Sequence, residues 1–481
     1  MIAFTIGRIL LAEALMMVPS LFVGLMHRER STWVFLPAIG LLLAVGLLLS
    51  LKKPQNTAIF ARDGYFIVAA VWILLSVFGA LPFWFSGYFA SFWDCLFEIA
   101  SGFSTTGASI LTDIDALPKC LLFWRSFSHW VGGMGVLMFV LAIMPLSEER
   151  SLHLMRAEVP GPSVGKLVPR MRDTAKILYA VYAGMTAILV VLLLFGGMPL
   201  FDALCYAFGT AGTGGFGTTN AGVALYDSAY IEIVLAVFML LFGVNFNLYF
   251  FLLIGKARDA LKSEELHVYL GIVAAAVAAI ALNTYHLYRT VGETLRYAFF
   301  QVATIISTTG FATADFAGVW PAFSRLVLVL LMFTGACAGS TGGGMKVSRV
   351  MLLVKTSAQE VRRLVHPRAI SVVRLEKKPA DHTLIRSTLT FFAMYIGCLT
   401  VVTLLLSLDE PDLVTDFTAA VACLSNIGPG LGKVGPLGNY AFYSGTSKAL
   451  LSLAMLAGRL ELFPIFVLFG FSTYKGRGAA R

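Results

Sequence analysis

Charged side chains are scarce in this chain. Of its 481 residues, 13% are Asp, Glu, Lys or Arg, whereas 58% are hydrophobic and the mean hydropathy is +0.82. Soluble globular domains carry about 25% charged residues, so this composition excludes a water-soluble protein and predicts an integral membrane protein. The net charge of +9 therefore bears on orientation in the bilayer, and nucleic-acid binding is not expected.

The sequence also lacks the common motifs of enzymes and metal sites. Its six cysteines form no C-x-x-C pair, which argues against a zinc site or a disulfide framework. There is no H-E-x-x-H motif, and we find no Ser/His/Asp constellation and no paired carboxylates expected within one apolar cavity. Residues Gly212–Gly217 match G-x-G-x-x-G by letter, but no hydrophobic strand precedes them. We therefore do not expect an enzyme.

Long apolar stretches are abundant, and a spanning helix takes about 20 mostly apolar residues. The first stretch carries Arg8 and Glu13 and has no small-residue cleavage site, so we expect a retained helix and not a signal peptide. The expected spans are Ile2–Met26, Thr32–Leu51, Tyr65–Phe85, Leu121–Pro145, Ala175–Phe195, Ala229–Ile254, Val268–Tyr285, Pro321–Val354, Ile385–Leu408 and Thr446–Tyr474.

Four short loops rich in Gly, Ser and Thr recur between these stretches. They read SGFSTTGAS, GTAGTGGFGT, ISTTGFATA and LSNIGPGLG. Aligning them places four glycines in one column, about 100 residues apart: Gly107, Gly215, Gly310 and Gly428. Each repeat reads as a spanning helix, a short amphipathic segment, the loop and a second spanning helix. Two spans per repeat give all four loops the same orientation.

Charge indicates which side the loops face. Most of the 36 Lys and Arg residues lie in the segments opposite the loops, which the positive-inside rule places in the cytoplasm. The segments around the loops contain more acidic than basic residues. The mouth formed by the loops is therefore expected to be extracytoplasmic and to concentrate cations.

A non-helical backbone at membrane depth is tolerated only where it is buried in protein or lines a wet cavity. Four such loops predict a pore, because glycine allows the backbone to turn its carbonyl oxygens toward an axis, where they replace the water around a monovalent cation. Hydroxyls of Thr105, Thr106, Thr308 and Thr309 can add ligands or brace the loops. The alternative is a set of Gly/Thr helix-packing motifs, which does not explain the same pattern four times.

With these loops, three further motifs resemble one family: FWRSFSHWVGGMG at Phe123–Gly135, GACAGSTGGGMK at Gly335–Lys346 and AGRLELFP at Ala457–Pro464. The chain resembles the Trk/Ktr/HKT superfamily of potassium transport proteins over nearly its whole length, and most of all its bacterial TrkH type. The resemblance implies an all-α polytopic membrane protein. In it, four pseudo-symmetric helix–pore loop–helix repeats surround a central pore, with two extra N-terminal transmembrane helices. It also implies a homodimer, a cytosolic TrkA-like regulatory ring that binds a nucleotide (ATP/ADP or NAD), and contact with membrane lipid.

The resemblance carries the superfamily's selectivity filter onto this sequence. Sodium-preferring members often have Ser at the first glycine position, so Gly107 favours potassium. The second loop, G-T-G-G-F, departs from relatives that have a larger residue before the paired glycines, which leaves its local geometry open. The implied K+-binding filter residues are Thr105, Thr106, Gly107, Ala108, Gly214, Gly215, Phe216, Thr308, Thr309, Gly310, Phe311, Asn426, Ile427, Gly428 and Pro429.

The stretch Pro321–Val354 is too long for one simple span and is cut by a glycine-rich run. Glycine costs about 1 kcal/mol in a helix interior, so this run should break the helix. A kinked packing helix is one interpretation. The resemblance favours another, an intramembrane gate loop below the filter, and its residues are Ala338, Gly339, Ser340, Thr341, Gly342, Gly343, Gly344 and Lys346.

Intramembrane cations need a partner or water. Lys346 can reach the membrane surface by snorkelling, whereas Arg459 lies inside an apolar helix. By resemblance Arg459 is the basic residue below the filter, which either slows cation passage or holds the gate loop. Arg125 and His129, one helical turn apart, are expected to be structural anchors. The basic segment 355–386 is either a plain positive-inside anchor, a surface for anionic lipid, or a docking site for a gating subunit.

The predicted function is potassium uptake through a channel-like pore in the bacterial cytoplasmic (inner) membrane. K+ coupled to H+ or Na+, or less selective Na+/K+ transport, remains open. A carrier that works by alternating access fits the four like repeats less well. A membrane-embedded enzyme would need polar catalytic residues that the spans lack. The expected organisation is an N-terminal hairpin (1–55) and four pore repeats (56–150, 151–262, 263–365 with the gate loop, and 366–481).

Overall fold

The computed structural model describes residues 2–52, 61–135, 171–368, 372–410 and 412–469. Within these ranges the regular secondary structure is almost all helical, and the only strands are β1 (Arg374–Leu375) and β2 (Lys378–Pro379). Six helices are long and apolar enough to cross a membrane, or seven if one bent pair is counted as a span. The end of the expected span Leu121–Pro145, the boundaries at 55/56 and 150/151, and the basic residues between 146 and 170 lie outside the described residues.

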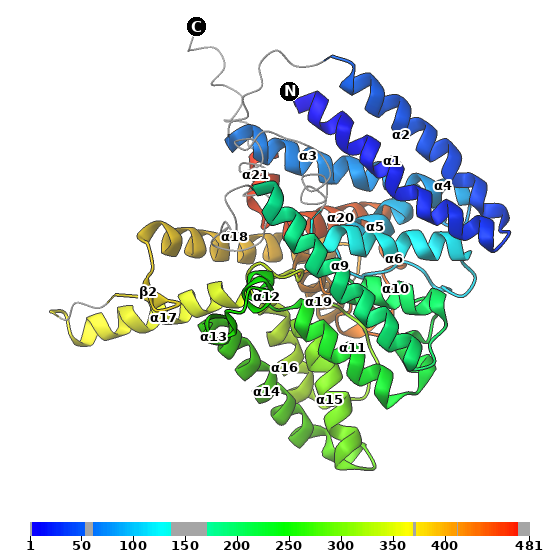
Figure 1. Cartoon of the computed structure of the whole chain (residues 1–481). Helices are drawn as coiled ribbons and strands as arrows, with labels where there is room; N and C mark the ends of the chain where they lie inside the picture. The colour runs from blue at the N-terminus through cyan, green and yellow to red at the C-terminus, as the bar shows by residue number, and fades with distance from the viewer. Residues whose placement is uncertain (1, 53–60, 136–170, 369–371, 411, 470–481) are drawn as a thin grey trace, which may run out of the picture.

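The N-terminal hairpin consists of α1 (Ile2–Met26), η1 (Arg30–Val34) and α2 (Phe35–Ser50). Its helices approach closely at two glycines, because a Cβ at Gly7 would lie 2.8 Å from the Gly46 carbonyl oxygen. Glu29 anchors the hairpin to the first repeat, since its carboxylate accepts the backbone N–H groups of Lys119 and Cys120 at 2.8 and 3.0 Å. The hairpin lies at the edge of the bundle in Figure 1.

The predicted helix, short helix, loop and helix occur four times. The first helices are α3 (Ala61–Gly79), α9 (Met171–Phe195), α14 (Glu264–Thr284) and α18 (His382–Leu406). The short helices are α5 (Phe92–Phe103), α10 (Leu200–Ala211), α15 (Val291–Ile306) and α19 (Leu413–Leu424). The second helices begin with α6 (Lys119–Gly133), α11 (Ala229–Phe242), α16 (Ala322–Phe333) and α20 (Gly445–Arg459). Short connecting elements are α4 (Leu81–Ser86), η2 (Gly222–Tyr226), η3 (Tyr285–Leu287) and η4 (Gly432–Val434).

Local sequence signals fix where the short helices begin. Ser91 and Asp94 form a capping box at the start of α5, and the Thr290 hydroxyl accepts the Glu293 N–H at the start of α15. Asp412 caps α19 by accepting two backbone N–H groups and a hydrogen bond from the Thr415 hydroxyl, which lowers the pKa of its carboxyl group. These short helices sit among the first and second helices (Figure 1).

Within the part of the chain that the structure describes, three second helices are broken. The predicted break in Pro321–Val354 is confirmed, because α16 ends at Phe333 and α17 (Val347–Val365) begins after an irregular segment. Two stretches expected to be single spans are not. The stretch Ala229–Ile254 divides into α11 and α12 (Phe246–Leu253), which are bent by 93°. The stretch Thr446–Tyr474 divides at residues 460–462 into α20 and α21 (Phe463–Phe469).

The unpredicted breaks have local causes. The Asn245 side chain accepts the Asn247 N–H and so starts α12 as a new helix. Glu461 and Leu462 have φ angles of 54° and 67°, which end α20. Both segments are dominated by hydrophobic residues, so the apolar pattern alone hides the breaks.

Past these breaks, α17 projects away from the bundle and ends near the two strands, while α13 (Ala257–Leu261) precedes α14 (Figure 1). The core of the bundle is apolar. Its largest fully buried side chains include Trp72, Trp124 and Trp320. Many Leu, Val and Phe side chains are exposed on the outer helices, as expected for surfaces that face lipid.

Candidate functional site

The four glycine loops, which follow the short helices, share one backbone geometry. Two residues after the end of each short helix lies a residue in the left-handed region. These residues are Thr105, Thr213, Thr308 and Asn426, with φ between 55° and 62°. The N–H of the residue after it donates to the carbonyl five positions back, at 2.9, 2.7, 2.8 and 2.9 Å in the four loops. This is the Schellman ending of a helix. The column of loops seen in the sequence is therefore a structural repeat as well.

The aligned glycines come next. Gly107, Gly215, Gly310 and Gly428 have φ angles of 79°, 81°, 88° and 94°, a region that side chains other than glycine rarely adopt. Each loop thus has two left-handed residues separated by one that is not. The second loop, whose geometry the sequence left open, follows the same pattern as the other three.

The loops meet in a closed ring. A Cβ added to Gly107 would collide with the carbonyl oxygen of Gly214 in the second loop, and one at Gly215 with that of Thr309. In the same order, a Cβ at Gly310 would collide with the Ile427 oxygen, and one at Gly428 would lie 2.7 Å from the Thr106 oxygen. The contacts therefore run from loop one to two, three, four and back to one. In each contact, the residue that supplies the carbonyl directly precedes the next aligned glycine.

All four aligned glycines line a hollow of about 200 Å³. The described residues contain no group of His, Cys, Asp and Glu arranged to hold a metal ion. The C-terminal ends of the four short helices lead into the ring, and the helix dipole makes these ends favourable for positive charge.

A buried ion pair braces the first two loops. Arg125 on α6 donates from Nε to Glu98 on α5 at 2.5 Å and from Nη1 to the Gly217 carbonyl oxygen at 2.9 Å. Its guanidinium lies 3.6 Å from the centre of the Phe216 ring, against which the His129 ring stacks at 4.1 Å. These contacts place both predicted anchors against the second loop.

Glu98 was missed by the sequence analysis. Its carboxylate also accepts hydrogen bonds from the Ser109 hydroxyl and the Ile110 N–H, so it holds the chain that leaves the first loop. An ionisable residue inside a short apolar helix is costly unless it is paired, and that cost is the signal that could have identified it.

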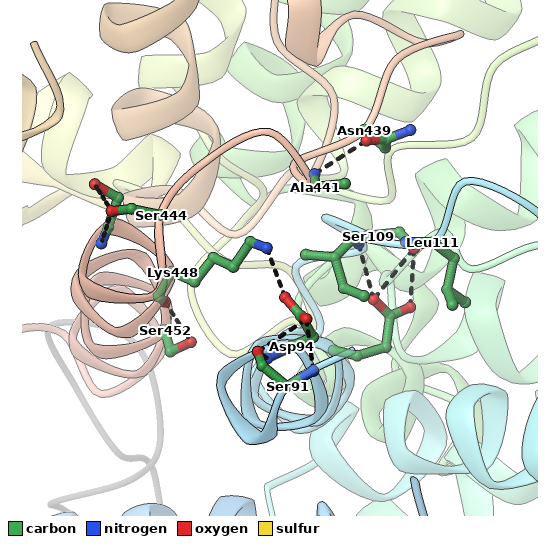
Figure 2. Close-up of polar contacts among 12 residues, drawn as sticks. Ser91, Asp94, Ser109, Leu111, Asn439, Ala441, Ser444, Lys448 and Ser452 are labelled. Carbon is green, nitrogen blue, oxygen red and sulfur yellow. Dashed lines mark hydrogen bonds and ion pairs between the residues drawn. The ribbon is translucent and has the colours of Figure 1, made fainter. Parts of the chain in front are cut away.

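A second buried pair joins the fourth repeat to the first. Figure 2 shows Lys448 of α20 reaching Asp94 of α5, with Nζ and Oδ1 2.6 Å apart. Asp94 also belongs to the capping box with Ser91. The pair ties the helix after the fourth loop to the helix before the first, on the seam where the ring closes.

The segment between α16 and α17, residues 334–346, is called the central loop below. It lies against the glycine loops, because the Gly343 N–H donates to the Thr308 hydroxyl at 2.7 Å. A Cβ at Gly342 or Gly343 would lie 3.0 or 2.7 Å from the carbonyl oxygens of Ser307 or Ser425. The predicted residues Ala338–Gly344 are thus next to the third and fourth loops.

Lys346 does not snorkel. Its side chain is buried, and its ammonium group donates to the carbonyl oxygens of Gly342 and Gly343. The break between α11 and α12 also docks on the central loop. The Cys337 N–H donates to Gly243 O, and the Phe246 N–H donates to Gly339 O, both at 3.0 Å.

Arg459, at the end of α20, contacts the central loop directly. Its Nη1 donates to the Thr341 carbonyl oxygen at 2.7 Å. Its Nη2 donates to the carbonyl oxygens of Gly132 and Gly133 at the end of α6, at 2.5 and 2.6 Å. One guanidinium therefore cross-links the central loop, the first repeat and the fourth repeat.

Comparison with known proteins agrees with this architecture. The family model described as "TrkH: Cation transport protein" matches residues 33–272 and 265–473. The Trk system potassium uptake protein TrkH of Salmonella typhimurium is 36% identical over 467 residues, which cover 96% of both chains. TrkG of Escherichia coli is 32% identical over 95% of this chain and 94% of its own.

Among solved structures, the crystal structure of the potassium transporter TrkH from Vibrio parahaemolyticus superposes with a TM-score of 0.88. It is 32% identical in sequence, and the match covers 98% of this chain and 99% of that one. With these matches over nearly the full length and six apolar spans, the chain is a multi-pass membrane protein that belongs to the TrkH family of cation transport proteins.

Proposed function

We propose that this protein takes up potassium ions across the bacterial cytoplasmic membrane through a channel-like pore, with the four glycine loops as its selectivity filter. The observation that carries the proposal is the closed ring in which each aligned glycine abuts the carbonyl of the next loop. The relatives named above are potassium uptake proteins, which supports the choice of ion. The proposed division into an N-terminal hairpin and four pore repeats is the one given in the sequence analysis.

Backbone oxygens suit this task. A ring of carbonyl dipoles can replace the hydration shell of a monovalent cation, and glycine is needed because each loop must approach its neighbour without a Cβ. The predicted filter residues from Thr105 to Ala108 and their counterparts in the other loops would supply these oxygens. Uptake needs no catalysed chemistry, because one cation that crosses 100 mV releases about 2.3 kcal/mol.

The central loop is the proposed gate. It packs against the third and fourth glycine loops on the side of the Thr308 hydroxyl, and its carbonyls are held by Lys346 and Arg459. Of the two roles open for Arg459, its hydrogen bond to Thr341 favours holding the gate. A loop secured by a few hydrogen bonds can have a second, displaced arrangement.

Partners complete the proposal. The relatives bear names that refer to a Trk system, which supports a gating partner. We assign that role to a cytosolic TrkA-like ring that senses ATP/ADP or NAD, acting on a homodimer of this chain. The projecting helix α17 carries Arg362 and Arg363 in its last turn and is the proposed docking element, with anionic lipid as the competing ligand.

Deleting residues 339–344 tests the gate. The deletion removes the part of the central loop that packs against the third and fourth glycine loops, so Rb+ uptake into proteoliposomes at an imposed potential should rise by about tenfold or more, equivalent to about 1.4 kcal/mol in barrier height. Na+ should compete poorly in both proteins. Unchanged or lower uptake by a deletion variant that purifies as a normal oligomer would contradict a gating role for the loop.

Replacing Gly107 with Ser tests the filter. The change places a side chain at a φ of 79° and against the Gly214 carbonyl oxygen, so this edge of the ring must widen. We expect the preference for K+ over Na+ to fall by about tenfold, or about 1.4 kcal/mol. Competition between Rb+ and Na+ in the same flux assay measures it, with Gly184→Ser as control, because a Cβ at Gly184 meets no atom within 4 Å. An unaltered ion preference would count against the filter assignment.

A further inference from the structure

One carboxylate joins the central loop to the start of α17. Glu265 lies in the first turn of α14 and is buried. Its Oε1 accepts the N–H of Ala338 at 2.8 Å and the N–H of Ser348 at 3.0 Å. Ala338 stands where the glycine-rich run begins, and Ser348 is the second residue of α17, just past its end. The same oxygen atom therefore joins two points of the chain that are ten residues apart.

The position of Glu265 is itself fixed by the hairpin that β1 and β2 form, called the β1–β2 hairpin below. Glu376, in the turn between β1 and β2, accepts the Ser263 hydroxyl at 2.8 Å and the backbone N–H groups of Glu264 and Glu265, both at 3.0 Å. It thereby caps α14, whose N-terminus favours negative charge. Lys355 of α17 donates to Glu264 and to the Arg374 carbonyl oxygen. These contacts bind the β1–β2 hairpin, α14 and α17 together.

The turn of the β1–β2 hairpin is held in an unusual conformation. Glu376 and Lys377 have φ angles of 51° and 64°, as a two-residue type I′ turn requires, although Asn-Gly is the usual sequence there. Three hydrogen bonds from the start of α14 to the Glu376 carboxylate offset this strain.

We propose that Glu265 is the positioning residue of the gate, and that Glu376 transmits the position of the β1–β2 hairpin to Glu265. This inference rests on the proposed role of the central loop. Glu265 is not among the residues that line the hollow at the ring. It acts by keeping Ala338 and Ser348 next to each other, so that the intervening loop stays folded against the filter. A displacement of the β1–β2 hairpin would carry the first turn of α14 with it. Glu265 would then release Ala338 and Ser348.

The physical reason is the satisfaction of buried backbone groups. A buried backbone N–H that loses its acceptor is left without a hydrogen-bond partner and without water, which is costly. Truncating Glu265 to Ala removes both bonds at once. Gln keeps an oxygen at the end of a chain of the same length, so Glu265→Gln retains an acceptor for both N–H groups.

The test uses two readouts on the full-length protein in proteoliposomes. The first is potential-driven Rb+ uptake by the wild type, Glu265→Ala, Glu265→Gln, Glu376→Ala and the 339–344 deletion. The second is the rate at which Cys337, which is buried beside Ala338, reacts with a maleimide in a background where the other five cysteines are replaced by Ser. Glu360→Ala, an exposed acidic residue on α17, is the matched control.

We expect Glu265→Ala to raise both Rb+ uptake and the Cys337 reaction rate by about tenfold, since the N–H groups of Ala338 and Ser348 both lose their acceptor. Glu265→Gln and Glu360→Ala should stay within about twofold of the wild type, and Glu376→Ala should change both readouts in the direction of Glu265→Ala. A positioning role predicts rescue by Gln, which a loss of folding would not give.

Two outcomes would separate the hypotheses. If the deletion raises uptake but Glu265→Ala changes neither uptake nor Cys337 reactivity, the positioning role of Glu265 is wrong and the gate stands. If the deletion leaves uptake unchanged while Cys337 becomes reactive in Glu265→Ala, Glu265 holds the loop but the loop is not the gate.

If Glu265→Ala does not purify as a folded oligomer, the rate at which Cys337 reacts in Glu376→Ala tests the proposal instead. A wild-type rate there overturns the transmission from the β1–β2 hairpin.

Discussion

Replacing Gly310 with Ala should abolish potassium selectivity while leaving the protein folded. Gly310 has the φ angle of 88°, and an added Cβ would collide with the Ile427 carbonyl oxygen and lie 2.9 Å from Cδ of Pro429. Both of these atoms belong to the fourth loop. Because the left-handed conformation costs a residue with a Cβ about 1–2 kcal/mol, the third loop would also tend to leave its conformation. The ring would then lose two of its four sides.

The measurement is the ratio of Rb+ to Na+ uptake at an imposed potential. We expect that ratio to fall by at least about tenfold, which corresponds to about 1.4 kcal/mol in relative barrier height. Gly271→Ala is the control, because Gly271 lies on α14 and a Cβ there meets no atom within 4 Å. A Gly310→Ala protein with wild-type ion preference would show that the close approach of loops three and four does not set selectivity.

The repeat was accessible from the sequence because each loop carries its geometry in its own residues. A Thr or Asn in the left-handed position followed two residues later by Gly is a local feature, and it recurs at Thr105, Thr213, Thr308 and Asn426. The break before α17 was accessible for the same reason, since several glycines interrupt one apolar stretch. Local chemistry of this kind needs no knowledge of what packs against it.

Long-range partners were not accessible. Nothing near Glu265 in the chain indicates that its carboxylate meets Ala338, 73 positions away. Lys448 and Asp94 are 354 positions apart and pair only because the fourth repeat returns to the first. The breaks at Asn245 and Leu462 were missed because hydrophobic residues surround them, and periodicity does not report backbone angles. Pairing across repeats depends on how the ring closes. The sequence reveals that there are four repeats but not which of their residues meet.

Truncating Glu98 to Ala should destabilise the protein by about 3–5 kcal/mol, because it leaves the Arg125 guanidinium buried without its counter-ion. Both side chains are almost fully buried, at 0% and 2% exposure. The variant also loses the hydrogen bonds to Ser109 and Ile110 that hold the chain after the first loop. The loss should appear as a lower midpoint of thermal unfolding in detergent. Unfolding is measured as the fraction of protein that no longer remains a monodisperse oligomer at each temperature.

Two further variants identify the cause. Lys433→Met removes an ion pair with Glu410 in which the lysine is 55% exposed, and such pairs contribute about 1 kcal/mol or less, so its unfolding midpoint should stay close to the wild type. The double variant Glu98→Ala, Arg125→Met removes both charges and should recover much of the loss, because the unpaired guanidinium is no longer present. If the double variant is less stable than Glu98→Ala by the full effect of Arg125→Met alone, the two residues are independent and the ion pair does not brace the loops. Recovery of stability without recovery of ion selectivity would show instead that the pair also sets the shape of the first two loops, since Arg125 is the residue that joins Glu98 to Gly217 and Phe216.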